Sequence, residues 1–131
     1  MKGHKALFSS LRSTWRTPTR LYRQLNAEFD FTFDPCPVDP KCDGLLVPWG
    51  KRTFANPPYG RTLGRWTHKA YRESRRGKLI VLLIPARTDT AWWHDDVMLA
   101  DEIRFLRGRL RFDDGNGRAT FPSAVVVFRA R

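Results

Sequence analysis

A short apolar segment runs into a stiff turn at Thr53-Phe54-Ala55-Asn56-Pro57-Pro58-Tyr59-Gly60. Its first three residues are typical of the end of a buried strand. The two prolines lack the backbone N–H that a sheet ladder needs, so the strand cannot continue through them. Each proline also holds the residue before it in an extended conformation. We therefore predict a rigid corner that carries an amide side chain and an aromatic ring at its mouth.

This corner suits a planar group that bears an –NH2. The Asn56 side-chain oxygen and the Pro57 backbone oxygen can each accept one amine hydrogen, and the Tyr59 ring can stack on the plane. Pro58 keeps the corner stiff. A turn of this kind can also be purely structural, so the tetrapeptide alone does not establish a site.

The tetrapeptide resembles the Asp/Asn/Ser-Pro-Pro-aromatic signature of S-adenosylmethionine-dependent amino-methyltransferases. Other segments narrow the resemblance to the phage-type DNA N6-adenine methyltransferases, because they follow that family's order and approximate spacing. These segments are Thr17-Pro18, Phe33 to Pro37, Asp43 to Leu45, Trp49, Trp66, Leu83 to Thr88 and Gly108 to Phe112. The resemblance extends over residues 14–129 and implies methyl transfer to adenine N6 in DNA.

Composition favours one basic globular domain. The chain has 131 residues, 41% of them hydrophobic, and a formal charge of +11. The length suits a single core without a separate target-recognition domain. We expect a basic arm at residues 1–16 and a single methyltransferase domain at 17–131. The charge favours a polyanion, here DNA, as the partner.

No apolar run approaches the roughly 18 residues that span a bilayer, and no signal segment opens the chain. We therefore expect a cytoplasmic protein, in the host cytoplasm if phage-encoded, that is a monomer or a weak homodimer. Cys36 and Cys42 have no second pair of metal-ligating residues nearby, so we expect no metal site. A disulfide between them is not expected in a reducing cytoplasm.

Hydrophobic patterning predicts an α/β fold. Residues 79–84 form the most apolar run and are typical of a central strand buried on both faces. Further strands are predicted at 31–34, 52–55, 103–106 and 123–128, the last antiparallel, with helices at 18–28, 62–76 and from Thr88 or Asp89 to Leu99. With the resemblance, this predicts a reduced Rossmann-like S-adenosylmethionine-dependent methyltransferase fold of about five strands with helices on both faces.

The resemblance implies S-adenosylmethionine as the cofactor. It assigns Thr17 and Pro18 to the methionine end of the cofactor and Asp34 to its cationic groups, with contacts from Pro35, Cys36 and Asn56. Asp34 alternatively only caps a turn. The chain departs from the family where a glycine-rich loop usually follows the first strand, since PCPVDPKCDG stands there instead. Asp43 is the residue we assign to the ribose hydroxyls, with Asp39 as an alternative.

Basic side chains flank the corner. Arg61 and Arg65 begin a helix whose other face is apolar, and we predict that they contact DNA phosphate together with Tyr59 on the base. The segment from 107 to 121 is predicted to contribute Arg107, Arg109, Arg111 and Phe112. Phe112 or Phe121 would form the second wall around an everted base, although core packing is the commoner role of each.

Rival functions follow from the same residues. The amine could belong to cytosine N4, an RNA adenine or a protein glutamine, although Asn56 disfavours cytosine and the +11 charge disfavours a protein substrate. The shortened interval between Asp34 and Asn56 keeps open a non-catalytic nucleic-acid-binding module on a degenerate methyltransferase fold. A domain that needs a partner copy to complete its pocket is a further alternative.

Overall fold

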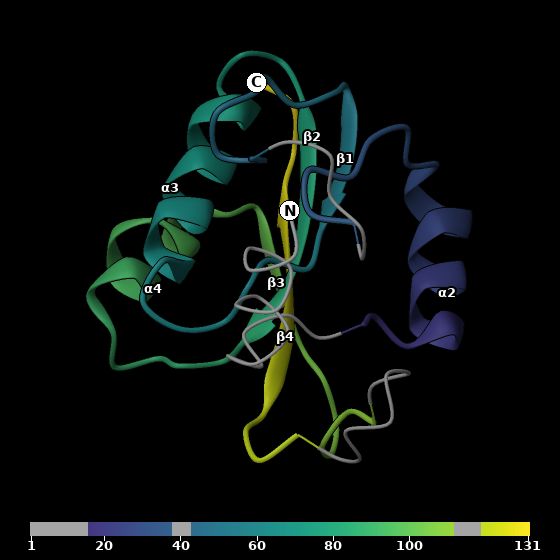
Figure 1. Ribbon diagram of the computed structural model, residues 1–131, viewed down its shortest axis with the longest axis vertical. Coiled ribbons are helices and arrows are strands. Elements are labelled where there is room, and N and C mark those ends of the chain that lie inside the picture. Colours follow the sequence, from purple (N-terminus) through teal and green to yellow (C-terminus); the bar gives the residue numbers. More distant parts are fainter. Residues whose placement is uncertain (1–15, 38–42, 112–118) are drawn as a thin grey trace, which may run out of the picture.

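A computed structural model describes residues 16–37, 43–111 and 119–131. Their elements form a mixed α/β structure (Figure 1). In chain order these are α2 (Thr19–Phe29), β1 (Arg52–Ala55), α3 (Leu63–Ser74), β2 (Leu79–Pro85), α4 (Ala91–Asp95), the 3-10 helix η1 (Val97–Leu99), β3 (Glu102–Phe105) and β4 (Ser123–Phe128). The predicted α/β class is confirmed.

The strands form one mixed sheet in the order β1-β2-β4-β3. β1 and β2 are parallel, with Thr53 opposite Ile80, and β4 lies antiparallel to both β2 and β3. Every residue of β4 is buried, as is all of β2 after Leu79. The prediction of an antiparallel last strand is therefore confirmed. Because β1 and β2 run the same way, their carboxyl ends meet at one edge of the sheet.

The predicted strand at 31–34 needs correction. It forms only an isolated parallel bridge between Phe33 and Thr53. The carbonyl of Arg52 accepts the N–H groups of both Thr32 and Phe33, and Phe54 donates back to Phe33. Pro35 then removes the next donor, so the ladder cannot extend. The sheet of the described residues has four strands, whereas we predicted about five.

Helices cover both faces of the sheet, as predicted. Alternate side chains of β4 point to opposite faces: Val125 and Val127 pack with Leu25 and Phe29 of α2, whereas Val126 and Phe128 pack with α3 and α4. Figure 1 shows α2 on one side of the sheet and α3 with α4 on the other.

The helix predicted to run to Leu99 is shorter than expected. α4 ends at Asp95, and a separate 3-10 turn follows. The side chain of Asp96, at the junction, accepts a hydrogen bond from the Thr67 hydroxyl, and its other oxygen lies 3.1 Å from His68 Nδ1. These bonds to α3 fix Asp96 away from a helical continuation.

A buried carboxylate anchors the end of α3. Glu73 is 2% exposed and receives bonds from Lys69, Lys78 and the Trp49 backbone N–H. Burial alone would raise its pKa, but these donors outweigh burial and leave the pKa below its usual range. The side chain thus ties α3 to the start of β2 and to the segment before β1.

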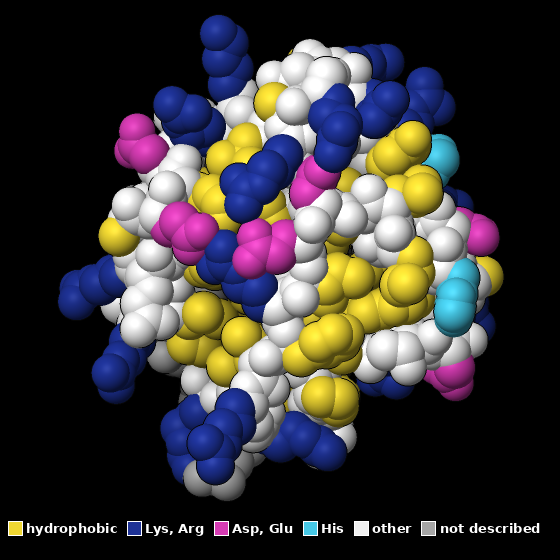
Figure 2. Space-filling model, turned by 180° about the vertical axis from the view of Figure 1, so that it is seen from behind, with side chains coloured by type: hydrophobic (Ala, Val, Ile, Leu, Met, Phe, Trp, Pro, Cys, Tyr) yellow, Lys and Arg dark blue, Asp and Glu magenta, His cyan; other side chains and the backbone are white. Residues whose placement is uncertain are grey.

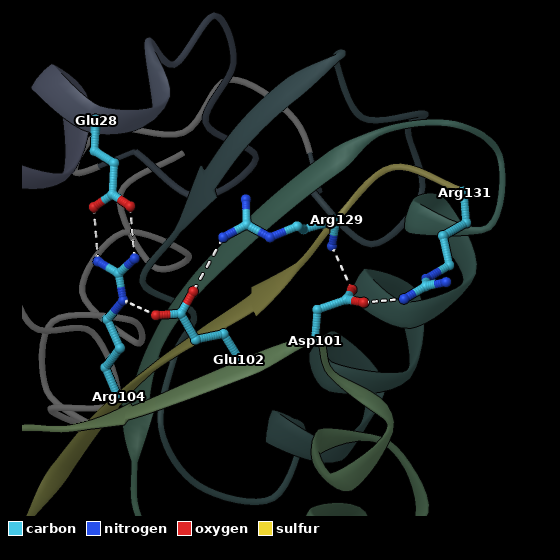
Figure 3. A network of polar contacts seen from close by, with 6 residues as sticks. All are labelled: Glu28, Asp101, Glu102, Arg104, Arg129 and Arg131. Atoms are coloured by element: carbon cyan, nitrogen blue, oxygen red, sulfur yellow. Dashed lines mark hydrogen bonds and ion pairs between the residues drawn. The ribbon is translucent and has the colours of Figure 1, made fainter.

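A chain of ion pairs joins the end of α2 to β3 and to the carboxyl-terminal segment (Figure 3). Arg104 donates two hydrogen bonds to Glu28 and one to Glu102, and Arg129 also bonds Glu102. Asp101 receives the Arg129 backbone N–H and pairs with Arg131. We call these six residues the edge network. Figure 2 shows acidic and basic side chains together near the middle of one face, with further Lys and Arg around its rim.

Candidate functional site

The Asn-Pro-Pro-Tyr corner lies directly after β1, at the edge where β1 and β2 both end. Asn56 is 7% exposed and Pro57 is buried, whereas Pro58 and Tyr59 are half-buried. Gly60 has a φ of +124°, a conformation that only glycine adopts readily, so it lets the chain leave the corner toward α3. The corner is therefore close to the surface but shielded from bulk water.

Two hydroxyl groups hold the Asn56 amide. Its Nδ2 donates to Thr17 Oγ1 at 3.0 Å, and the Tyr59 hydroxyl donates to its Oδ1 at 3.0 Å. Thr17 comes from the segment just before α2, on the other side of β1 in sequence. The fold thus brings Thr17, which we assigned to the site separately, to Asn56 and Tyr59 of the corner.

Asp34 reaches the same corner through Cys36. The Asp34 carboxylate accepts the Cys36 backbone N–H at 2.9 Å. Cys36 in turn lies beside Asn56, whose backbone N–H bonds its thiol. Burial and the Asp34 charge raise the pKa of that thiol well above the usual range, and the Asn56 bond only partly opposes the rise. Neighbouring protein atoms raise the pKa of Asp34 too, and its bonds with Cys36 only partly offset the rise. Asp34, Cys36 and Asn56 therefore form one contiguous group.

Tyr59 is held as a neutral hydrogen-bond donor. Burial is the main cause that raises its pKa, with a smaller contribution from Cys36. Its ring meets Phe121 edge-on, with ring centroids 5.3 Å apart, and the Arg87 guanidinium lies 5.7 Å from the Phe121 centroid. From sequence we expected Ala86-Arg87-Thr88 to follow β2 into the ligand crevice, but we gave Arg87 no role in the site.

The remaining predicted cofactor residues are Pro18, Pro35 and Asp43. Pro18 is half-buried before α2, and Pro35 is buried beside Gly44, whose added Cβ would lie 2.1 Å from the Pro35 oxygen. Asp43 accepts the Leu45 N–H at 2.9 Å and faces a hollow of about 460 Å³ along α3. The hollow is also lined by basic side chains, namely Arg65, Lys69, Arg72 and Arg76. Asp39 lies outside the described residues, and the ribose role of Asp43 stays a prediction.

The predicted DNA contacts lie on the surface. Arg61 and Arg65 are exposed at the start of α3, and Arg107, Arg109 and Arg111 are exposed after β3. Phe112 lies outside the described residues, as does almost all of the predicted arm at 1–16. Each of these DNA contacts stays a prediction.

Two kinds of feature are absent from the described residues. In residues 16–37, 43–111 and 119–131, no group of three or more His, Cys, Asp or Glu side chains is arranged to hold a metal ion. Among those same residues, no helix has the length and apolar character required to cross a bilayer.

Comparison with known families identifies the kind of protein that has this corner. The family model described as DNA N-6-adenine-methyltransferase (Dam) matches residues 5–127. The match covers nearly the whole chain, and the chain belongs to this family. At the level of the family, membership implies methylation of DNA at adenine N6 and dependence on S-adenosylmethionine. No curated protein and no solved structure matches the chain.

Proposed function

We propose that this chain transfers a methyl group from S-adenosylmethionine to N6 of an adenine extruded from DNA, on a reduced Rossmann-like fold. The observation that carries the proposal is the placement of the Asn56 amide, the Tyr59 ring and the Asp34 carboxylate in one contiguous group at the carboxyl edge of parallel strands. Ligands of open α/β sheets bind at this edge.

The donor set fits the cofactor. S-adenosylmethionine supplies, when bound, an electrophilic methyl group on a positively charged sulfur. Asp34 provides a carboxylate that joins the corner through Cys36, which suits the cationic groups of that cofactor. Pro35 and Cys36 line the same approach in this proposal, and Thr17 and Pro18 belong to its methionine end.

The corner itself binds the target amine. The Asn56 Oδ1 and Pro57 carbonyl oxygens accept the two hydrogens of adenine N6, and the Tyr59 ring stacks on the base. The Tyr59 hydroxyl already donates to Oδ1, but a carbonyl oxygen has a second lone pair for the amine. Both acceptors draw electron density toward N6 and hold its lone pair out of conjugation with the ring. Extrusion costs a few kcal/mol, which stacking and these bonds offset.

The basic surface holds the DNA around the corner. In the proposal, Arg61 and Arg65 contact DNA phosphates beside α3. On the other side of the corner, the DNA strand is contacted by Arg107, Arg109, Arg111 and Phe112. Most of this contact is sequence-independent, since phosphate carries no base information.

The test is incubation of the whole chain with labelled S-adenosylmethionine and DNA of mixed sequence, followed by mass spectrometry of the nucleosides. We expect N6-methyladenine. Asn56→Ala should lower transfer about 100- to 1,000-fold, the loss typical of one preorganised polar group, with DNA binding nearly unchanged. Detection of N4-methylcytosine alone, or a fully active Asn56→Ala protein, would reject the assignment.

Asn26→Ala is the matched control. Asn26 has the same type of side chain, and its Oδ1 accepts the Phe31 N–H at 2.8 Å at the end of α2. Its loss should weaken the fold without removing a group from the corner. Comparable loss of transfer in both variants would show that Asn56 acts only through stability.

A further inference from the structure

The orientation of the Asn56 amide decides what the corner can recognise. A primary amide has nearly the same shape after a half-turn about its last bond, but its oxygen and –NH2 exchange places. With Oδ1 toward the substrate it accepts an amine hydrogen. If Nδ2 faced the substrate instead, the amide would present hydrogen-bond donors. Such donors repel an amine and suit an acceptor such as a ring nitrogen or a carbonyl oxygen.

Thr17 and Tyr59 hold the accepting orientation from opposite sides. Thr17 Oγ1 accepts from Nδ2 and the Tyr59 hydroxyl donates to Oδ1, both at 3.0 Å, on a residue that is 7% exposed. To reverse the amide, both hydroxyl groups would have to exchange donor and acceptor roles together. Burial makes an intermediate with mismatched groups costly.

We propose that Thr17 is a positioning residue that fixes the Asn56 amide with its oxygen toward the exocyclic amine, and so helps the site distinguish adenine from a base without that amine. The inference rests on the proposed function, because it assumes that the amine enters the corner. It gives Thr17 a role in base recognition that a contact with the cofactor alone would not.

Thr17→Val and Thr17→Ser separate the hydroxyl from the shape of the side chain. Valine keeps the branched shape but cannot accept the amide hydrogen, whereas serine keeps the acceptor. We expect Thr17→Val to lower kcat about tenfold, a loss typical of one hydrogen bond between neutral groups. Thr17→Ser should stay within about twofold of the unmodified chain, as one retained bond implies.

A binding measurement tests recognition without turnover. The probes are single-stranded oligodeoxynucleotides that contain adenine, and matched ones in which purine, which lacks the amine, replaces every adenine. The unmodified chain and Thr17→Ser should bind the adenine strand more tightly, and Thr17→Val should lose most of that preference. Calorimetry with S-adenosylmethionine measures cofactor affinity separately, and a loss of that affinity in Thr17→Val would report its contact with the methionine end of the cofactor.

Thr90→Val is the control for a lost hydroxyl elsewhere. Thr90 Oγ1 accepts the Trp93 N–H at the start of α4, so this variant should keep both kcat and the preference for adenine. The proposal is overturned if Thr17→Val retains the adenine preference, or if it weakens cofactor affinity alone. Absence of methyl transfer by the unmodified chain would reject the proposed function, while the binding comparison would still decide the role of Thr17.

Discussion

The corner at Asn56 and the edge network both attach α2 to the rest of the molecule, one at each end of the helix. Thr17, just before α2, bonds Asn56, whereas Glu28, near the end of α2, bonds Arg104 on β3. The Thr17, Asn56 and Tyr59 side chains of the corner are neutral and shielded, whereas the edge network consists of charged side chains that are 17–58% exposed. The first arrangement suits recognition of a ligand, and the second suits attachment of the helix.

The exposure of the side chains to water explains why the edge network and the corner suit different roles. Glu28, Arg104 and Glu102 are 44%, 31% and 37% exposed, so water screens their attraction and each pair contributes little. Several ion pairs together attach α2, so that loss of one pair leaves the others in place. At the corner each polar group has a distinct partner in a site with little water, so one lost group changes what the site can bind.

After Asn56→Ala, the largest effect should follow removal of the Tyr59 ring. Tyr59→Ala is expected to lower kcat/KM for methyl transfer about 10- to 100-fold, because stacking of one base on an aromatic ring contributes about 1–3 kcal/mol. Tyr59→Phe keeps the ring and removes the hydroxyl with its hydrogen bond to Asn56, so its loss should be about tenfold. Steady-state transfer assays with DNA as the varied substrate measure both.

Tyr71→Ala controls for loss of a half-buried tyrosine. Its ring packs against Phe128 on the face of the sheet that α3 covers, so the variant should be less stable and keep its kcat/KM. If Tyr59→Phe were as impaired as Tyr59→Ala, the hydroxyl and not stacking would be the main contribution, and the ring would not be the platform for the base.

A smaller effect, on stability alone, should follow substitution at the edge network. Arg104→Met keeps a long apolar side chain and removes the bonds to Glu28 and Glu102. We expect the free energy of unfolding to fall by about 1 kcal/mol, since these are exposed pairs that act as a network. Urea denaturation followed by tryptophan fluorescence measures this, with an unchanged m-value. Methyl transfer should remain within about twofold, because Arg104 contacts none of the corner residues in the described structure.

Arg129→Met sharpens that measurement. The Arg129 side chain makes one bond to Glu102 at 3.1 Å, against the three bonds of Arg104. Its substitution should cost less than half as much. The guanidinium groups of Arg104 and Arg129 lie 5.4 and 6.0 Å from the centroid of the Phe29 ring. Equal losses of unfolding free energy in the two variants would indicate that this packing on Phe29 contributes more than the ion pairs.

Much of this molecule follows from local sequence patterns. The apolar spacing of Leu21 and Leu25 predicts α2 to within one residue at each end, and the run from Leu79 predicts β2. The two prolines predict the corner. These features depend on residues close in the chain, where backbone chemistry and side-chain periodicity decide the outcome.

The failures concern contacts between distant segments. Phe33 has the pattern of a strand residue, but Arg52 and Pro35 limit its pairing to one bridge. The bond of Thr17 to Asn56 spans 39 residues and that of Arg104 to Glu28 spans 76. Nothing local indicates which hydroxyl or guanidinium will meet a given partner, because tertiary packing sets those distances.

The smallest effect should be on the pH dependence of stability, which should have opposite signs for the edge network and for Asp34. Hydrogen bonds from Arg104 hold the pKa values of Glu28 and Glu102 below their usual range. Their contribution is therefore complete above the pKa values of the unfolded chain, and is lost as the pH falls through the lower values of the folded state. The stability deficit of Arg104→Met relative to the unmodified chain should accordingly shrink below about pH 4.5, near the ordinary pKa of glutamate.

Asp34 should behave in the opposite way. Asp34 is exposed, but desolvation by the protein atoms around it raises its pKa. The folded state therefore binds a proton more readily than the unfolded chain, and ionisation of this group opposes folding as the pH rises through the folded-state value. Asp34→Asn keeps an oxygen for the Cys36 N–H and removes that charge, so it should be the more stable protein at neutral pH, with an advantage that disappears on acidification. Urea denaturation from pH 7 to pH 3 compares both variants with the unmodified chain. An Asp34→Asn protein that is less stable at pH 7 would mean that the fold favours this carboxylate in its charged form, and the electrostatic contrast between the corner and the edge network would be wrong.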